Sequence, residues 1–233
     1  MTLNEIKDKI SITPYYEELN GSGILYCADC LSVLKMLPDK CVDLILTDPP
    51  YGIEYEGGFP NSEQFEAIIN DSIGNIDFKI LIQELRRIGK QVIIFGANNF
   101  YQDLPHKGSW ICWDKRCNSD ADKLFGSKFE LAWMDLENNG SGGRKMYRIQ
   151  HAGAKNADGE GQKRLHPTQK PVRLFSAIIR DFSNETDLTL DPFLGSGTTA
   201  VAAKELGRRF IGIEISPAYC KLSADRLRQG VLL

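Results

Sequence analysis

Residues 188–214 read LTLDPFLGSGTTAVAAKELGRRFIGIE, and this stretch decides the fold class. Its apolar beginning and end predict two strands, and the small and aliphatic residues between them predict a helix. The turn before the helix holds Gly195 and Gly197. Backbone N–H groups and a helix N-terminus can therefore approach a ligand closely at this turn. Together these elements predict a parallel β-α-β unit that binds a ligand.

The ligand predicted for this unit contains adenosine. The turn lacks the Gly-Lys-Ser/Thr ending of a Walker loop, and Ala200 stands where a dinucleotide fingerprint has its third glycine. Glu214 ends the second strand, where an acid accepts hydrogen bonds from ribose hydroxyls. A solvent-facing glutamate is the alternative interpretation of Glu214. The missing pyrophosphate loop disfavours NAD, and with it an NAD-dependent oxidoreductase.

Short apolar strands alternate with helical stretches along the whole chain of 233 residues, without an internal repeat. This alternation predicts one doubly wound α/β domain over residues 1–233, with a mostly parallel sheet and helices on both faces. Seven strands are predicted, at 23–27, 42–47, 91–96, 110–113, 129–134, 188–191 and 209–214. Helices are predicted near 29–37, 62–70, 75–89, 97–104, 169–182, 197–207 and 216–229.

The composition is that of an ordinary soluble protein, with 42% hydrophobic and 25% charged residues and a net charge of −3. No apolar run is long enough for a membrane span, and the N-terminus is unlike a signal peptide, so we expect a cytoplasmic protein. The six cysteines are too sparse for a disulfide scaffold. We expect buried thiols and no metal, although Cys27, Cys30, Cys112 and Cys117 leave a four-thiolate zinc site open.

A second motif, Asp48-Pro49-Pro50-Tyr51, follows the predicted strand 42–47. Open α/β sheets place their active sites at this edge. The two prolines make the turn stiff and present its carbonyl groups without a competing N–H. One carboxylate, one carbonyl and one aromatic ring suit a planar base with an amino group, whereas an ordinary turn is the alternative.

Three motifs together resemble the amino-methyltransferases of DNA. They are DPPY, the segment DPFLGSGTT and the segment HPTQKP, at residues 48–51, 191–199 and 166–171. Their order, with the catalytic motif first and the cofactor glycines last, resembles the circularly permuted β class. The resemblance spans roughly residues 23–215. It implies the Rossmann-like fold of S-adenosylmethionine-dependent methyltransferases, with one antiparallel strand in a seven-stranded sheet.

The resemblance implies transfer of a methyl group to N6 of an adenine flipped out of double-stranded DNA. Asp48 and the carbonyl group of Pro49 would accept hydrogen bonds from the amino group. Pro50 would stiffen the turn, and Tyr51 would stack on the base. Cytosine N4, which family members with Ser in place of the Asp more often methylate, stays open as the target. An RNA or protein substrate and a non-catalytic binding module also stay open.

The resemblance also implies which residues bind S-adenosylmethionine. Glu214 would hold the ribose hydroxyls, and Asp29 and Cys30 would lie near the adenine ring. Thr168 and Lys170 would meet the methionine carboxylate, although a plain surface lysine is the alternative for Lys170. The glycine-rich turn would contribute Asp191, Phe193, Gly195, Gly197, Thr198 and Thr199.

Residues 136–165 predict a long basic loop inserted into the domain. From 142 to 173, eight lysines and arginines stand against two acids. A solvated charged loop is the alternative, but the resemblance implies a target-recognition region. Its small size predicts a short target site or help from the second subunit of a homodimer. The expected contacts with DNA phosphates are Arg144, Lys145, Arg148, Lys155, Lys163 and Arg164.

Overall fold

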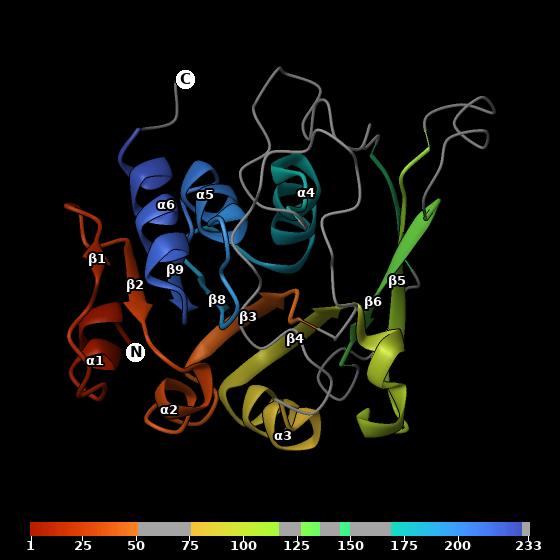
Figure 1. The fold of residues 1–233 in the computed structure, drawn as a ribbon, viewed down its shortest axis with the longest axis horizontal. Coiled ribbons are helices and arrows are strands. Elements are labelled where there is room, and N and C mark those ends of the chain that lie inside the picture. Colours follow the sequence, from red (N-terminus) through yellow and green to blue (C-terminus); the bar gives the residue numbers. More distant parts are fainter. Residues whose placement is uncertain (51–75, 117–126, 136–144, 150–168, 230–233) are drawn as a thin grey trace.

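The computed structural model describes residues 1–50, 76–116, 127–135, 145–149 and 169–229. Their strands form one sheet in the order β1-β2-β9-β8-β3-β4-β6-β5-β7 (Figure 1). In chain order the strands are β1 (Tyr16–Glu17), β2 (Gly23–Cys27), β3 (Val42–Thr47), β4 (Gly89–Phe95), β5 (Ser109–Asp114), β6 (Phe129–Met134), β7 (Lys145–Arg148), β8 (Leu188–Asp191) and β9 (Arg209–Glu214).

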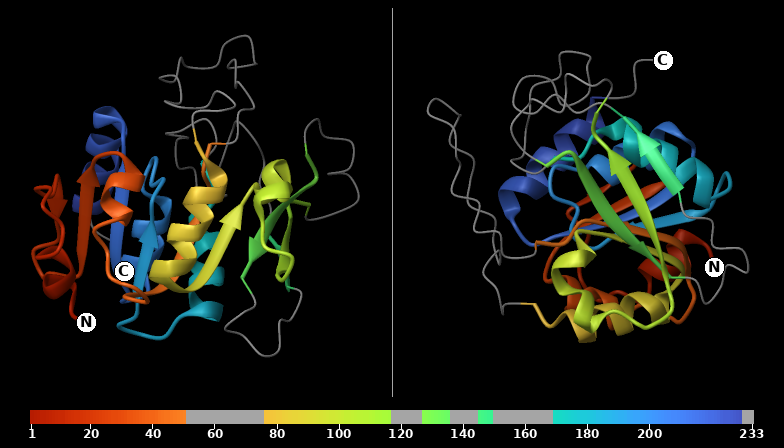
Figure 2. Two further views of the ribbon diagram at one scale, coloured as in Figure 1. Left: turned by 90° about the horizontal axis from the view of Figure 1, so that it is seen from below. Right: turned by 90° about the vertical axis from the view of Figure 1, so that its right-hand side faces the viewer.

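Helices cover both faces of this sheet, as the sequence predicted. Figures 1 and 2 show α4, α5 and α6 on one face, with α1, α2, α3 and the 3-10 helix η1 on the other. The helices are α1 (Leu3–Lys7), α2 (Cys30–Leu34), α3 (Phe78–Ile88), η1 (Ala97–Asp103), α4 (Val172–Phe182), α5 (Thr198–Glu205) and α6 (Pro217–Arg228). The predicted helix at 62–70 lies outside the described residues.

Five neighbouring strands, β2, β9, β8, β3 and β4, run parallel to one another. The next strand, β6, pairs antiparallel with both β4 and β5. It is therefore the one antiparallel strand among the seven that the sequence predicted. The Rossmann-like α/β fold is confirmed.

The predicted number of seven strands is too low, because β1 and β7 add one strand at each edge of the sheet. Strand β1 has only two residues, too few to show the apolar pattern by which a strand is predicted from sequence. Strand β7, Lys145–Arg148, pairs in parallel with β5 inside the segment that we predicted to be a loop. That part of the loop prediction is wrong. This edge strand reads Lys-Met-Tyr-Arg and lacks the continuous apolar run by which buried parallel strands are recognised.

Strand β3 lies at the centre of the sheet, between β8 and β4. Val42 and Ile45 pack in the core cluster on the α2 and α3 side. Leu44 and Leu46 pack in the cluster on the α4, α5 and α6 side. Each of these buried side chains contributes about 1.5–3 kcal/mol of transfer free energy. Burial on both faces fixes the strand, and with it the position of the residues that follow.

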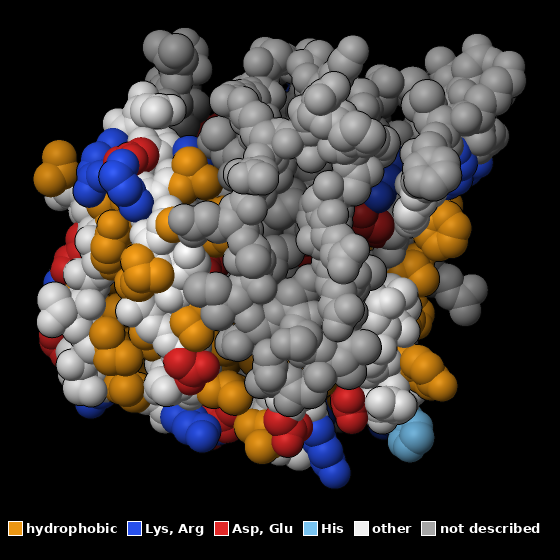
Figure 3. All heavy atoms as spheres, in the orientation of Figure 1, with side chains coloured by type: hydrophobic (Ala, Val, Ile, Leu, Met, Phe, Trp, Pro, Cys, Tyr) orange, Lys and Arg blue, Asp and Glu red, His pale blue; other side chains and the backbone are white. Residues whose placement is uncertain are grey.

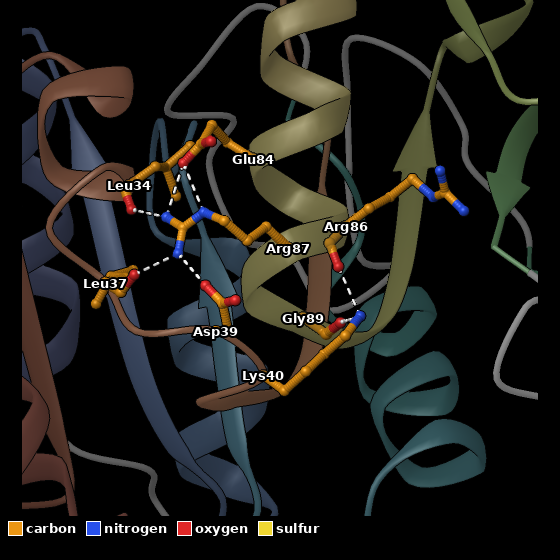
Figure 4. A network of polar contacts seen from close by, with 8 residues as sticks. All are labelled: Leu34, Leu37, Asp39, Lys40, Glu84, Arg86, Arg87 and Gly89. Atoms are coloured by element: carbon orange, nitrogen blue, oxygen red, sulfur yellow. Dashed lines mark hydrogen bonds and ion pairs between the residues drawn. The ribbon is translucent and has the colours of Figure 1, made fainter.

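The loop before β3 is fastened to the end of α3 by two basic side chains (Figure 4). The guanidinium of Arg87 donates to the carbonyl oxygens of Leu34 and Leu37, at 3.0 and 2.7 Å. It also forms 2.7 Å ion pairs with Asp39 and Glu84. From the loop itself, the ammonium of Lys40 donates to the carbonyl oxygens of Arg86 and Gly89, at 2.6 and 2.8 Å. These contacts hold α2, β3 and α3 in a fixed relation at the amino-terminal end of β3.

The described surface mixes charges of both signs. On the face shown in Figure 3, acidic and basic side chains lie close to one another in several places, between apolar ones. Among the large apolar side chains, Leu19, Tyr101 and Met146 are well exposed. Within the described ranges, no helix is long and apolar enough to cross a membrane.

Candidate active site

Asp48 follows β3 directly, at the carboxyl edge of the sheet. Its side chain is 16% exposed, and its Oδ2 lies 2.5 Å from the ammonium nitrogen of Lys170. The other oxygen, Oδ1, is buried and accepts no hydrogen bond from the described residues. Burial raises the pKa of Asp48, Lys170 opposes this rise, and Glu130 adds to it. Asp48 therefore offers one open acceptor oxygen where the sequence predicted the active site.

Lys170 lies just before α4, and its side chain is only 7% exposed. Its ammonium is shared between Asp48 Oδ2 and Glu130 Oε2, the latter at 3.2 Å. It also lies 5.7 Å from the centre of the Phe95 ring. An ammonium this buried needs opposite charge close by. The alternative of a plain surface lysine is wrong, and the contact with a cofactor carboxylate stays a prediction.

Glu130, the second residue of β6, was not predicted as a site residue. Besides Lys170 it forms an ion pair with Lys115, which follows β5. Burial acts to raise the pKa of Glu130, but Lys170 and Lys115 outweigh it, so the pKa is lowered. The site thus holds a row of alternating charges, formed by Asp48, Lys170, Glu130 and Lys115.

Asp191 ends β8, next to β3, and is 4% exposed. Its Oδ1 accepts from the Thr47 hydroxyl at 2.7 Å and from the Phe193 N–H at 3.0 Å. Its Oδ2 accepts from the Thr199 hydroxyl at 2.5 Å. Burial raises the pKa of Asp191 to about 6, although these hydrogen bonds oppose the rise. Asp191 therefore ties the end of β3 to the beginning of α5.

The glycine-rich turn between β8 and α5 has the backbone that its glycines predict. Gly195 and Gly197 have φ values of 54° and 89°, in the left-handed region where other residues are strained. A Cβ atom on Gly197 would lie 3.0 Å from Ser223 Oγ. Thr198 and Thr199 form the first turn of α5, and the Thr198 hydroxyl donates to the Lys170 carbonyl at 3.4 Å.

Helix α6 holds this turn from the outside. The Ser223 hydroxyl donates to the carbonyl oxygen of Gly195 at 2.7 Å. The guanidinium of Arg226 donates to the carbonyl oxygen of Ser196 at 2.6 Å. Within the turn the Gly197 N–H donates to the Leu194 carbonyl at 2.9 Å, and the two contacts from α6 satisfy the next two carbonyl groups. The turn is therefore fixed in place.

Glu214 ends β9 on the other side of the turn. Its Oε2 accepts from the Gly195 N–H and its Oε1 from the Ser216 N–H, both at 2.8 Å. Burial raises the pKa of Glu214, whereas these N–H groups lower it. The alternative of a solvent-facing glutamate is wrong. A carboxylate has about four acceptor positions, so two hydroxyl groups could still bind to it.

Asp29 and Cys30 lie after β2, which pairs with β9. Asp29 caps α2 and accepts from the N–H and the hydroxyl of Ser32, each at 2.8 Å. Burial raises the pKa of the Cys30 thiol to about 12, so this thiol stays protonated. Because β2 and β9 are parallel neighbours, both residues share an edge of the sheet with Glu214. The structure therefore brings together Glu214 and the two residues predicted near the adenine ring.

The cysteines do not converge on a zinc site. Cys27 lies in β2 and Cys112 in β5, six strand positions apart in the sheet order. At about 4.8 Å per strand, this separates them by roughly 29 Å. Cys117 lies outside the described residues. The four-thiolate alternative is wrong.

Two of the six residues predicted to contact DNA phosphates are described, and both lie on β7. Lys145 is held by Asp181 at 2.8 Å and lies 4.8 Å from the centre of the Phe182 ring. Arg148 is 74% exposed and lies 3.6 Å from Asp114. The predicted site residues outside the described ranges are Tyr51, Arg144, Lys155, Lys163, Arg164 and Thr168.

Among the residues that the sequence did not single out are Thr47, Glu130 and Ser223, which contact predicted site residues, and Arg226, which contacts Ser196 in the glycine-rich turn. A hydroxyl at the last position of a buried strand could have singled out Thr47. An acid at the beginning of an otherwise apolar strand could have singled out Glu130. No signal marks Ser223 and Arg226, because they belong to an ordinary amphipathic helix.

Comparison with known proteins identifies the family. The family model described as DNA methylase, of the N6/N4 type, matches residues 126–225. The type II methyltransferase M2.LlaDCHI of Lactococcus lactis subsp. cremoris is 30% identical over 268 residues, which cover 99% of this chain and 98% of that protein. The chain belongs to this family of DNA methyltransferases. S-adenosylmethionine is the methyl donor of the family.

Two further proteins are similar to this methyltransferase. The type II methyltransferase M.HinfI of Haemophilus influenzae is 31% identical over 241 residues, covering 86% of this chain and 67% of that protein. The structure of PvuII DNA methyltransferase, described as cytosine-N4-specific, matches with a TM-score of 0.64 and 17% identity, over 93% of this chain and 89% of that one. At this identity the second likeness shows a shared fold.

Proposed function

We propose that this methyltransferase transfers a methyl group from S-adenosylmethionine to the exocyclic N6 of an adenine flipped out of a short site in double-stranded DNA. The observation that carries the proposal is the arrangement of hydrogen bonds at the Asp48 carboxylate. Its Oδ2 is held by Lys170, and its Oδ1 is buried and has no hydrogen bond from the described residues. Asp48 opens the motif DPPY, and family members that act on cytosine N4 more often have Ser there.

Asp48 acts on the target by orienting its amino group. The lone pair of an exocyclic amino group is delocalised into the ring, so the nitrogen is a poor nucleophile. Asp48 Oδ1 accepts one of its hydrogens and the carbonyl oxygen of Pro49 accepts the other. This draws the nitrogen towards tetrahedral geometry and frees the lone pair. Tyr51 supplies the aromatic surface on which the base stacks.

Protonation of Asp48 decides whether this can happen. A proton on Oδ1 would present a hydrogen where the amino group presents one too, so Oδ1 serves as acceptor only while it carries no proton, as in the ionised form. Burial favours the protonated form, and Lys170 opposes it. After transfer the nitrogen must release one hydrogen as a proton. Asp48 already accepts that hydrogen, and its raised pKa suits it to receive the proton.

The residues around the glycine-rich turn fit S-adenosylmethionine. When bound, the cofactor supplies a methyl group on a positively charged sulfur. Gly195 and Gly197 allow close approach of the backbone, and the Glu214 carboxylate can accept hydroxyl groups. Asp191, Phe193, Thr198 and Thr199 shape the turn, and Asp29 and Cys30 flank it. We retain Lys170 and Thr168 as the partners proposed for the methionine carboxylate.

We also propose the circularly permuted β class. Asp48 precedes Asp191 by 143 positions in the sequence, yet β3 and β8 are neighbours in the sheet. A permuted order requires that the strand of the catalytic motif, here β3, comes first in the chain and still lies beside the strand of the cofactor turn, here β8. The region 136–165, now including β7, remains the proposed target-recognition element, and a homodimer remains a prediction.

The test is methylation followed by mass analysis of nucleosides. The protein is incubated with methyl-labelled S-adenosylmethionine and either duplex DNA or RNA, and the products are digested. We expect N6-methyladenine from DNA and none above background from Asp48→Asn, whose melting temperature should stay near that of the wild type. Label in N4-methylcytosine would assign the alternative target. Methyladenine found only in RNA would contradict the proposed substrate.

A further inference from the structure

The carboxylate of Glu130 joins two ammonium groups beside Asp48. Its Oε2 lies 3.2 Å from Lys170 Nζ, and its Oε1 contacts Lys115 Nζ. The side chains are largely withdrawn from solvent, with exposed fractions of 26% for Glu130, 7% for Lys170 and 17% for Lys115. Charges in such surroundings interact more strongly than surface pairs do.

The fold places Glu130 there through the reversed direction of β6. Because β6 runs antiparallel to β4 and β5, its first residues lie at the carboxyl edge of those strands. Glu130 stands opposite Trp113 of β5. Lys115 is fixed in turn, since its N–H donates to the Lys128 carbonyl and its ammonium lies 5.0 Å from the Trp113 ring. Glu130 is therefore anchored independently of Lys170.

An anchored second carboxylate matters because a lysine side chain has many conformations. Holding one lysine in a single conformation costs about 2 kcal/mol of side-chain entropy. Asp48 alone would let the Lys170 ammonium move around its carboxylate and occupy either oxygen. Glu130, as a second partner of the ammonium at 3.2 Å, favours the arrangement in which Lys170 meets Oδ2 and leaves Oδ1 open.

We propose that Glu130 is a positioning residue, which holds the Lys170 ammonium against Asp48 Oδ2 so that Asp48 keeps an ionised, open Oδ1 for the amino group of the target base. This inference rests on the proposed function only for the identity of the target. The arrangement of the three charges is a property of the protein without substrate. Glu130 itself touches no reacting atom.

The pKa of Asp48 distinguishes positioning from a plain charge effect. The charged groups that act on Asp48 are Lys170, Glu130, Lys115 and Asp191. The Glu130 charge by itself raises the pKa of Asp48. If charge were its whole role, Glu130→Gln would lower the pKa of Asp48. If Glu130 holds Lys170, the substitution releases the ammonium, and the pKa of Asp48 rises instead.

The first experiment measures this pKa without DNA or cofactor. Side-chain carboxyl carbons of 13C-labelled protein are titrated by NMR, and the Asp48 signal is assigned by its absence in Asp48→Asn. We expect a higher pKa for Asp48 in Glu130→Gln. Glu130→Asp keeps the charge but withdraws it by one methylene group, so positioning predicts a rise there as well. A pKa that falls in Glu130→Gln, or stays unchanged in both variants, would overturn the proposal.

The second experiment follows methyl transfer against pH. We expect Glu130→Gln to lower kcat by roughly tenfold to a hundredfold, to move its acid limb to higher pH and to change the KM for DNA little. In a Lys170→Met background, Glu130→Gln should add no further loss, because it acts through Lys170. An equal loss in both backgrounds would contradict the proposal.

The matched control is Glu84→Gln, which removes a carboxylate of similar exposure, 20%, from an ion pair with Arg87 on α3. We expect no change in the Asp48 pKa or in kcat. Failure of the wild type to methylate DNA would refute the proposed function and leave the NMR result on Glu130 intact.

Discussion

The hydroxyl of Thr47, at the end of β3, donates a 2.7 Å hydrogen bond to Asp191, at the end of β8. Both side chains are buried, and they are 144 residues apart in the sequence. Thr47 is followed directly by Asp48, and Asp191 opens the glycine-rich turn. This one contact therefore joins the proposed catalytic motif to the proposed cofactor turn.

Loss of this hydroxyl should destabilise the protein. Thr47→Val keeps the shape of the side chain but leaves the buried Asp191 carboxylate with one donor fewer. We expect the free energy of unfolding, measured with urea at pH 8, to fall by about 1–3 kcal/mol. The matched control is Thr189→Val on β8, because the buried Thr189 hydroxyl has no hydrogen-bond partner in the described structure. A cost for Thr189→Val as large as for Thr47→Val would contradict this account.

Asp191 should also make stability depend on pH. Its pKa is raised from 3.8 to about 6 in the folded protein, so the folded state binds its proton more tightly than the unfolded state. The stability that Asp191 contributes is therefore present below pH 3.8 and is lost as the pH rises to about 6. The difference in unfolding free energy between wild type and Asp191→Asn should change over this interval and be constant above pH 7. A difference that does not vary with pH would show that the Asp191 pKa is not raised.

Helix α6 should control the affinity for the cofactor without contacting it. Ser223→Ala removes the donor to the Gly195 carbonyl and lets the turn relax. We expect the Kd for S-adenosylmethionine, measured by calorimetry, to rise roughly twofold to tenfold, as for one hydrogen bond of about 0.5–1.5 kcal/mol. Ser176→Ala in α4 is the matched control, because the buried Ser176 hydroxyl has no partner among the described residues. Equal Kd values for Ser223→Ala and wild type would refute a role for this contact.

Arg148 is the described basic residue best placed to contact DNA phosphates, because it is 74% exposed on the edge strand β7. Arg148→Gln should weaken binding to all DNA sequences alike and reduce the slope of log Kd against log salt concentration by about 1. Fluorescence anisotropy at several salt concentrations measures both. The control is Lys90→Gln. Lys90 is exposed and lies near the beginning of β4, at the amino-terminal ends of the strands, whereas Arg148 lies at the carboxyl end of β7. This substitution should leave the slope unchanged. An unchanged slope for Arg148→Gln would remove this residue from the DNA interface.

The sequence predicted the residues that follow or end parallel strands. Asp48, Asp191 and Glu214 each stand there, and parallel strands bring such residues to one edge whatever their separation in the chain. Closely spaced glycines and an apolar run before an acid can be recognised in a short stretch of sequence. The turn at 195–197 and strand β3 could therefore be predicted without knowledge of their neighbours. These central residues of the site could therefore be predicted from short, separate stretches of sequence.

The contacts between these stretches could not be predicted in this way. Glu130 begins an antiparallel strand, so it reaches the same edge from the opposite direction, and only the pairing of β6 with β4 and β5 reveals it. The partnership of Lys170 with Asp48 depends on where the chain before α4 crosses the sheet. Lys145 belongs to an edge strand with one neighbour, which leaves no continuous apolar signal in its sequence.

The order of the strands in the sheet has a consequence for the folding of this protein during its synthesis. Strands β2 and β3 leave the ribosome early, but β8 and β9, which lie between them, begin about 140 and 160 residues after the end of β3. At about 5–20 residues per second, the gap stays open for roughly 7–30 s. During that time β2 and β3 each present an uncovered edge on which other chains could pair. Synthesis of residues 188–214 ends this exposure, so a pause in translation before them should increase aggregation.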